Sequence, residues 1–201
     1  MTQEQVLEVF RRCGALLQGH FVLRSGKHSR TFFQCALVLQ DPVATAELCG
    51  ALVAKVKVER WTFHSVISPA MGGILVGHEV GRHLARRHIF AEKEEGKLKI
   101  RRFEVKPGEK FLVAEDVITT GSAVKEVIQM VKEAGGEVAG VACLVDRRRM
   151  RFGRRRRWSA PLNQNPGAGH TGWCRRVNWT RRRTSTGCFL NSPPGWSGRC
   201  W

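Results

Sequence analysis

The sequence predicts an α/β fold in which a central parallel sheet is flanked by helices. From about residue 41 to residue 146, short apolar strands alternate with segments whose apolar residues recur at helical spacing. The predicted strands at 111–114 and 138–145 are apolar as continuous runs, not on every second residue only, and the short predicted strand at 65–68 has the adjacent apolar pair Val66 and Ile67 at its centre. Such runs are typical of parallel strands that helices cover on both faces.

The first forty residues precede this alternation and predict one helix and two strands. Thr2 and Gln5 have the spacing of a capping box, and apolar residues then recur at helical spacing up to Cys13. Residues 20–40 mix β-forming residues with a basic turn rich in Ser and Gly. We therefore expect two strands joined by a loop in this segment.

Local signals place the elements of the core. Asp41 before Pro42 is typical of a helix N-terminus, and Gly135 with Gly136 is typical of a helix end. The charged segment 93–102 is expected to be a loop. In chain order we expect helix 42–57, strand 65–68, helix 74–87, strand 88–92, strand 111–114, helix 124–134 and strand 138–145.

Basic residues are concentrated at the end of the chain. Residues 1–146 hold 20 Lys and Arg against all 17 Asp and Glu, so this body is nearly balanced in charge. Residues 147–201 hold 14 Arg and five of the six Trp, with no acidic residue. The net charge of +17 therefore reflects mainly this segment, and the composition of the body makes nucleic acid an unlikely partner for it.

Signals for a membrane, for secretion and for a zinc site are missing from the sequence. No apolar run approaches the roughly 20 residues needed to span a bilayer. The first residues lack the basic-then-apolar order of a secretory signal. The seven Cys include no C-x-x-C pair and no Cys/His cluster at zinc spacing. We therefore expect a cytoplasmic protein with no membrane partner.

Residues 111–123 combine an apolar strand, two carboxylates and a turn of small residues. Glu115 and Asp116 come directly after the apolar run, and Thr-Thr-Gly-Ser-Ala follows at 119–123 before a helix. In such a turn the backbone N–H groups converge on a phosphate, and the helix N-terminus adds partial positive charge. The carboxylates then need another partner, such as sugar hydroxyls or a magnesium-bound group. The stretch therefore predicts a site for a phosphorylated sugar.

This stretch closely resembles the signature of the type I phosphoribosyltransferases, which use phosphoribosyl pyrophosphate (PRPP). The shared order is apolar residues, an acidic pair, two variable positions and Thr-x-Gly-Ser. The resemblance implies the type I phosphoribosyltransferase fold, with a small N-terminal hood beside the parallel sheet. It also implies that Glu115 and Asp116 hold the ribose hydroxyls and that 119–123 hold the 5′-phosphate. The PRPP-binding residues that it implies are Ala70, Gly72, Lys93, Glu115, Asp116, Val117, Ile118, Thr119, Thr120, Gly121, Ser122 and Ala123.

Three further segments resemble the orotate phosphoribosyltransferases of this family. Residues 21–33 look like their hood, which implies that Lys27 contacts substrate anions and that Phe32 and Phe33 line the pyrimidine pocket. Residues 68–74 look like their pyrophosphate loop, with Ser68 where Gly is more usual. Residues 144–147 look like the strand whose terminal Arg binds the orotate carboxylate. The orotate-binding residues implied are Lys27, Phe32, Phe33, Thr119 and Arg147.

The resemblance also implies a reaction and its requirements. Members transfer ribose 5-phosphate from PRPP to orotate, which gives orotidine 5′-monophosphate and pyrophosphate in pyrimidine (UMP) biosynthesis. Lys93 matches a lysine of their catalytic loop, although Glu92 stands where Arg is commoner, and Lys93 and Asp116 are the catalytic residues implied. The loop of one subunit enters the site of the other in a homodimer. Mg²⁺ is the implied cofactor, held mainly by PRPP and not directly by the protein.

Other interpretations of these segments stay open. The turn at 119–123 is also typical of ordinary helix capping, Phe32 and Phe33 of a core, and Lys93 or Arg147 of a solvated surface. A purine phosphoribosyltransferase would keep the PRPP signature without the hood segment. A regulator that senses PRPP and binds nucleic acid would bind PRPP without turnover.

The resemblance ends near residue 147. We expect an N-terminal helix and hood at 1–40, a phosphoribosyltransferase core at 41–150, and an atypical basic tail at 151–201 without regular structure. The tail's composition is typical of an out-of-frame reading of a GC-rich gene, so a frameshift is our hypothesis for its origin. The alternative is an arm in which Arg binds phosphates and Trp stacks on bases.

Overall fold

The structure is a computed structural model that describes residues 1–23, 26, 28–148 and 199–200. The helices are α1 (Gln3–Arg12), α2 (Cys35–Leu39), α3 (Pro42–Val58), α4 (Gly72–Leu84) and α5 (Ser122–Glu133). The strands are β1 (Leu16–Val22), β2 (His28–Phe33), β3 (Ser65–Pro69), β4 (Arg87–Glu94), β5 (Lys97–Lys99), β6 (Lys110–Ile118), β7 (Glu137–Asp146) and β8 (Arg199–Cys200).

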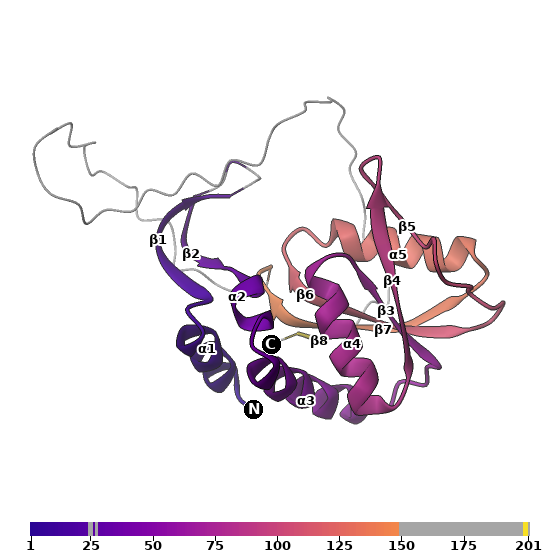
Figure 1. Ribbon diagram of the computed structural model, residues 1–201, viewed down its shortest axis with the longest axis horizontal. Helices are drawn as coiled ribbons and strands as arrows, with labels where there is room; N and C mark the ends of the chain where they lie inside the picture. Colours follow the sequence, from indigo (N-terminus) through magenta and orange to yellow (C-terminus); the bar gives the residue numbers. More distant parts are fainter. Residues whose placement is uncertain (24–25, 27, 149–198, 201) are drawn as a thin grey trace, which may run out of the picture.

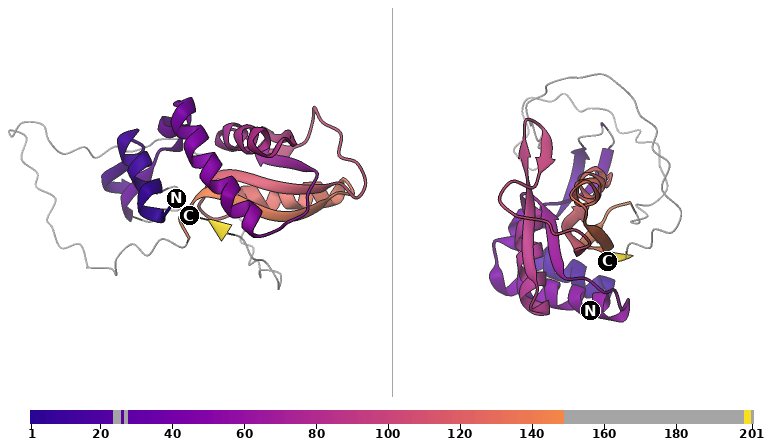
Figure 2. Two further views of the ribbon diagram at one scale, coloured as in Figure 1. Left: turned by 90° about the horizontal axis from the view of Figure 1, so that it is seen from below. Right: turned by 90° about the vertical axis from the view of Figure 1, so that its right-hand side faces the viewer.

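A six-stranded sheet in the order β5-β4-β3-β6-β7-β8 forms the centre of the molecule (Figure 1). Its neighbouring strands are parallel except for the antiparallel pair β4 and β5. The antiparallel ribbon of β1 and β2 is separate from this sheet and lies with α1 at one end (Figure 2). The predicted fold class, a mostly parallel sheet flanked by helices, is confirmed.

Helices cover both faces of the sheet, which explains the continuous apolar strands. Successive residues of a strand point to opposite faces. Val66 and Leu112 belong to the core cluster shared with α1, α2, α3 and α4. Ile67 and Val113, their neighbours in sequence, belong to a second cluster shared with α5. Because both faces are buried, both sets of residues must be apolar.

The helix starts follow the signals in the sequence. Thr2 and Gln5 form the capping box of α1, in which each side chain bonds to the other residue's backbone N–H. The Asp41 carboxylate accepts hydrogen bonds from the N–H groups of Val43 and Ala44 at the start of α3. Helix α4 begins two residues earlier than expected, at Gly72.

Three segments differ from the sequence prediction. Residues 35–39 form α2 instead of continuing a strand, because β1 begins at Leu16, opposite Phe33, and offers β2 no partner beyond that pair. The charged segment after residue 93 contains β5, which forms a hairpin with β4. Strand β6 continues through the acidic pair to Ile118, because β7 pairs with it along its whole length.

The predicted tail, 151–201, lies outside the described residues except for one short strand. Arg199–Cys200 pairs in parallel with β7 and forms the edge of the sheet, which differs from the expectation of no regular structure. Within the part of the chain that the structure describes, no helix is both long and apolar enough to cross a membrane.

Gly140→Ala should destabilise the fold. A Cβ atom at position 140 in β7 would lie 2.4–2.6 Å from three ring carbons of Trp61, closer than carbon atoms approach. Overpacking of this kind costs about 1–3 kcal/mol, so we expect a lower free energy of unfolding in a denaturant titration.

Gly50→Ala is the matched control for this variant. In α3 the new Cβ would meet the His83 ring at 3.4 Å, and Ala favours the helix by about 1 kcal/mol over Gly. We expect unchanged or higher stability. Equal stability of the Gly140→Ala chain and its parent would contradict the packing described here.

Candidate active site

The predicted site residues lie at the carboxyl ends of three neighbouring strands, and we call this end of the sheet its carboxyl edge. Strand β3 ends at Pro69, β6 carries Glu115 and Asp116 near its end, and Arg147 follows β7. Since these strands are parallel and adjacent, their carboxyl ends meet at this edge. The Arg147 N–H donates to the Ile118 carbonyl at 3.0 Å, which joins the last two ends.

The turn after β3 packs closely against the acidic pair. A Cβ at Gly72 would lie 2.2 Å from Oδ2 of Asp116, and a Cβ at Gly73 would lie 3.2 Å from Oε1 of Glu115. Only residues without a side chain permit this approach. The structure therefore brings Gly72 and the acidic pair together, as the sequence predicted, although they are more than forty residues apart.

Burial determines the protonation of Glu115, the first residue of the acidic pair. Glu115 is 7% exposed. Burial, together with a hydrogen bond to Asp116 and the charge of that neighbour, raises the pKa of Glu115 to about 9. The Asp116 carboxylate accepts a hydrogen bond from the Val117 N–H at 2.8 Å. Around neutral pH the Glu115 carboxyl thus keeps its proton, which limits the repulsion that two carboxylates would exert on an anionic substrate.

The turn at 119–121 and the start of α5 carry the residues that the sequence predicts to bind phosphate. Gly121 has φ +78° and stands at the N-cap position, where a glycine has no side chain to cap the helix. The first turn of α5 holds no acidic residue, and the Thr120 and Ser122 hydroxyls lie 3.1 Å apart at its entrance. The Ser122 N–H donates to the Thr120 hydroxyl at 3.3 Å, and exposed hydroxyls together with the remaining N–H groups of a helix start suit a phosphate.

Arg147 lies half-buried beside the acidic pair, together with a residue that the sequence did not point to. Burial lowers the pKa of the Arg147 guanidinium, and among the described residues its buried Nε has no hydrogen-bond partner. Cys35, 4% exposed, is the first residue of α2. Burial, the charge of Asp116 and a hydrogen bond to that carboxylate raise the pKa of the Cys35 thiol. No local pattern marked Cys35, because α2 reaches the site only through the fold.

Arg148 is a second residue that sequence reasoning missed. Its Nε and Nη2 donate to the buried Asp146 carboxylate, each at 2.9 Å. Its Nη1 lies 3.5 Å from the position that a Cβ would take at Gly121. A guanidinium therefore borders the predicted phosphate site. The motif that pointed to Arg147 gave no information on its neighbour, which is the second residue of a run of three arginines.

The predicted hood residues are divided between the core and the surface. Phe33 is 5% exposed and packs edge-on against Phe10 of α1, with ring centroids 5.5 Å apart. Phe32 is half-buried and contacts Phe21, with centroids 5.6 Å apart. The structure thus makes Phe33 a core residue, and Phe32 is the better placed of the two to border a pocket. Lys27 lies outside the described residues.

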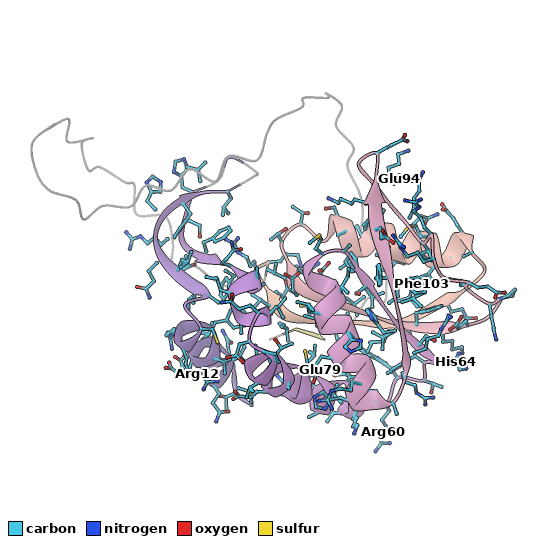
Figure 3. All side chains as sticks on the ribbon, in the orientation of Figure 1. Arg12, Arg60, His64, Glu79, Glu94 and Phe103 are labelled. Carbon is cyan, nitrogen blue, oxygen red and sulfur yellow. The ribbon has the colours of Figure 1, made fainter. Side chains whose placement is uncertain are left out.

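Lys93 lies on the hairpin of β4 and β5, which projects from the sheet (Figure 1; Glu94, beside it, is labelled in Figure 3). Glu95 and Gly96 at the tip both have positive φ, as tight hairpins require. Lys93 itself is exposed, whereas Lys99 and Arg101 pair with Glu94. The segment is therefore a hairpin and not an irregular loop.

The other residues predicted to bind PRPP are apolar, so only their backbone groups could bind it. Val117 is half-buried and Ile118 is buried, and both lie in β6. The Ala70 N–H donates to the Ala91 carbonyl at 2.8 Å, and the peptide bond between Ala70 and Met71 is cis. Ala123 is half-buried in the first turn of α5.

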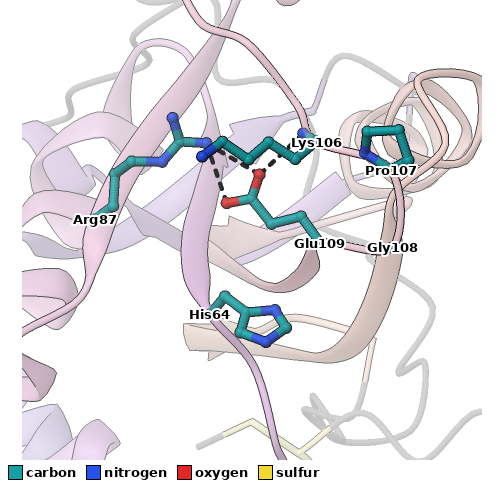
Figure 4. A pocket seen from close by; sticks show the side chains of 6 residues that line it. All are labelled: His64, Arg87, Lys106, Pro107, Gly108 and Glu109. Carbon is teal, nitrogen blue, oxygen red and sulfur yellow. Dashed lines mark hydrogen bonds and ion pairs between the residues drawn. The ribbon is translucent and has the colours of Figure 1, made fainter.

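A cavity of about 420 Å³ lies at the opposite edge of the sheet (Figure 4). It is lined by His64, Arg87, Lys106, Pro107, Gly108 and Glu109. Its polar groups are largely satisfied internally: Glu109 accepts hydrogen bonds from Ser65, Arg87 and the Lys106 N–H. Because β3 and β6 begin here, the acidic pair at the far end of β6 does not border this cavity. We therefore place the candidate site at the carboxyl edge.

Known proteins similar to this chain point to the same chemistry. Residues 39–159 match the family described as phosphoribosyl transferase domain. The orotate phosphoribosyltransferase of Desulforamulus reducens is 54% identical over 148 residues, which cover 73% of this chain and 76% of that protein. The corresponding protein of Chlorobium phaeobacteroides is 52% identical over the same shares. The crystal structure of orotate phosphoribosyltransferase from Aeropyrum pernix has a TM-score of 0.62 at 25% identity and covers 71% of this chain and 81% of its own.

Glu115→Gln should change how stability depends on pH. The folded chain holds the Glu115 proton up to a pKa of about 9, whereas the unfolded chain releases it near the ordinary value of 4.5. Between these values the folded state binds more protons, so raising the pH lowers stability, by at most ~1.4 kcal/mol per pH unit. Gln resembles the protonated acid, so the variant should lose this decline and be the more stable chain at alkaline pH.

Denaturant midpoints measured across this pH range test the expectation. Glu133→Gln, an exposed change on α5, is the control and should retain the parental decline. Parallel pH profiles for Glu115→Gln and its parent would show that Glu115 is ionised in the folded chain.

Proposed function

Because the chain belongs to the phosphoribosyl transferase family, and within it to the orotate phosphoribosyltransferases, we propose that the carboxyl edge of its sheet transfers ribose 5-phosphate from PRPP to orotate. The products would be orotidine 5′-monophosphate and pyrophosphate. The observation that carries the assignment of the site is the contact of Gly72 and Gly73 with the acidic pair, beside the uncapped start of α5.

We assign PRPP to the centre of this edge. The ribose hydroxyls bind Asp116, which accepts hydrogen bonds, and Glu115, which in its protonated form can also donate one. The 5′-phosphate lies in the cradle at 119–123, and the pyrophosphate lies along the turn after β3. This arrangement places each anionic group of PRPP at backbone N–H groups and not against the acidic pair.

Orotate lies beside the ribose in this proposal. The Arg147 guanidinium has a buried Nε without a partner among the described residues, and a carboxylate would satisfy it. Thr119, exposed at the start of the cradle, supplies a hydroxyl on the same side. Phe32 and the hood loop with Lys27 would border the ring. Ionised orotate needs no general base.

The donor set fits a magnesium ion that arrives with the substrate. Within the described ranges, no group of three or more His, Cys, Asp or Glu residues could hold a metal. In this proposal the ion is held mainly by PRPP, where it would supply positive charge to the pyrophosphate leaving group.

We propose that the active species is a cytoplasmic homodimer. Lys93 is exposed on a hairpin that projects from the sheet, which suits a residue that neutralises pyrophosphate in a neighbouring copy's site. In this proposal Lys93 and Asp116 are the catalytic residues, and the two lie on different subunits of one site.

An activity panel tests the proposed function. The full chain is incubated with PRPP, Mg²⁺ and one of orotate, uracil, adenine, guanine or hypoxanthine, and pyrophosphate release is followed. We expect release with orotate alone. Turnover of a purine would favour the purine alternative, and PRPP binding without any turnover would favour a PRPP-sensing regulator.

The origin of the basic tail is a separate hypothesis with its own test. Sequencing the gene and measuring the intact mass of the natural protein will show whether a frameshift produced 151–201. A mass that matches the printed sequence would contradict the frameshift and favour an authentic basic arm.

Asp116→Asn and Arg147→Ala should affect different substrates. Loss of the Asp116 charge removes a charge-assisted hydrogen bond to ribose, worth about 1.5–3 kcal/mol, so kcat/KM for PRPP should fall roughly 10–150-fold. Arg147→Ala should raise the KM for orotate while that for PRPP stays the same. Steady-state kinetics with each substrate varied measure both effects.

Arg12→Ala, which removes an exposed ion pair with Glu47, is the control for both variants and should leave both substrates unaffected. Equal losses for orotate and PRPP in the Arg147→Ala chain would point to a folding defect and remove Arg147 from the orotate site.

A further inference from the structure

A polar pair lies under the turn that precedes the acidic site. The Ser68 hydroxyl and Nε2 of His88 are hydrogen-bonded at 2.7 Å. Ser68 is fully buried near the end of β3, directly before the turn, and His88 lies on the neighbouring strand β4. His88 pairs with Val66 in register, which places the two polar side chains on the same face of the sheet.

Helix α4 has a glycine at each point where it packs against this pair. A Cβ at Gly77 would lie 2.3 Å from Nε2 of His88 and 2.8 Å from the Ser68 hydroxyl. A Cβ at Gly73, one turn earlier, would lie 3.3 Å from Cβ of Ser68 and 3.2 Å from Glu115. The same face of α4 therefore contacts both the Ser68–His88 pair and the acidic pair. A shift of α4 that moves the polar pair would also move the helix relative to the acidic pair.

The pair is a neutral hydrogen bond. Burial, with a smaller effect from the charge of His78, lowers the pKa of His88 to about 4. Removing either partner would leave a polar group without its hydrogen bond under α4, which costs more than removing both. Ser68 and His88 are thus a matched combination, in which each side chain satisfies the other.

We propose that Ser68 and His88 are positioning residues that fix the turn at 69–73 in the conformation that receives the pyrophosphate group of PRPP. The inference rests on the proposed function, which assigns pyrophosphate to this turn. Neither side chain touches substrate. The hydrogen bond acts through the end of β3, and Gly77 provides the space that it needs.

Calorimetric binding of PRPP and of orotate to the full chain tests the proposal, alongside kcat and both KM values. Ser68→Ala and His88→Leu should each weaken PRPP binding roughly tenfold, because each change leaves the partner's polar group without a hydrogen bond. Orotate binding should change little, whereas the melting temperature should fall in each single variant because a buried polar group loses its partner. His88→Gln, which keeps a side chain able to bond Ser68, should recover most of the PRPP affinity.

The double variant and a control make the outcome specific. Ser68→Ala with His88→Leu should bind PRPP no more weakly than either single variant, because neither group is then left unsatisfied. His78→Ala, on the exposed side of α4 next to the His88 ring, should behave like the parent.

Two results would overturn the proposal: single variants that bind PRPP as the parent does, or single variants that lose PRPP and orotate binding equally. A parent chain that binds PRPP and fails to turn over orotate would contradict the proposed function instead. In that case the effect of the pair on PRPP binding is still measured.

Discussion

The close approach of the β3 turn to the acidic pair is the constraint on which the site depends. Asp116 lies where a side chain at position 72 would be, and Glu115 lies at the edge of the space left by Gly73. This contact needs β3 and β6 to be adjacent and parallel, so that their carboxyl ends meet. It also needs α4 to begin at once after the turn, with glycine facing the strands. The sheet order, the helix start and the site therefore depend on one another.

The same packing accounts for the electrostatics of the site. Two carboxylates beside an anion-binding turn would repel the substrate if both were fully charged. Burial under α4 keeps the proton on Glu115, whose pKa rises to about 9. Arg148 borders the turn at Gly121, and the charges of Asp116 and of the half-buried Arg147 both act on the buried Cys35 thiol. Packing thus lowers the negative charge of the site at the place where phosphates are to bind.

Much of the fold and the centre of the site were predictable from the sequence because their signals are local. Continuous apolar runs identified the buried strands, and Asp41 with Pro42 identified the start of α3. Glu115 and Asp116 stand next to the turn that they accompany. What failed depends on contacts between distant segments. Phe33 and Phe32 are adjacent and chemically alike, and only packing against Phe10 makes one of them a core residue. Helix α2, Cys35 and the Ser68–His88 pair become visible only when separate strands and helices come together.

Gly72→Ala tests the central claim most directly. The change adds one methyl group whose nearest neighbours are atoms of the Asp116 carboxylate, at 2.2 and 2.6 Å from its Oδ2 and Cγ, and Ala suits a helix start at least as well as Gly. Calorimetry with the full chain should show a large loss of PRPP affinity with orotate affinity retained, because the methyl group displaces the Asp116 carboxylate. Leu75→Ala, on the exposed side of the next turn of α4, should bind both as the parent does. Unchanged PRPP affinity in the Gly72→Ala chain would contradict the account.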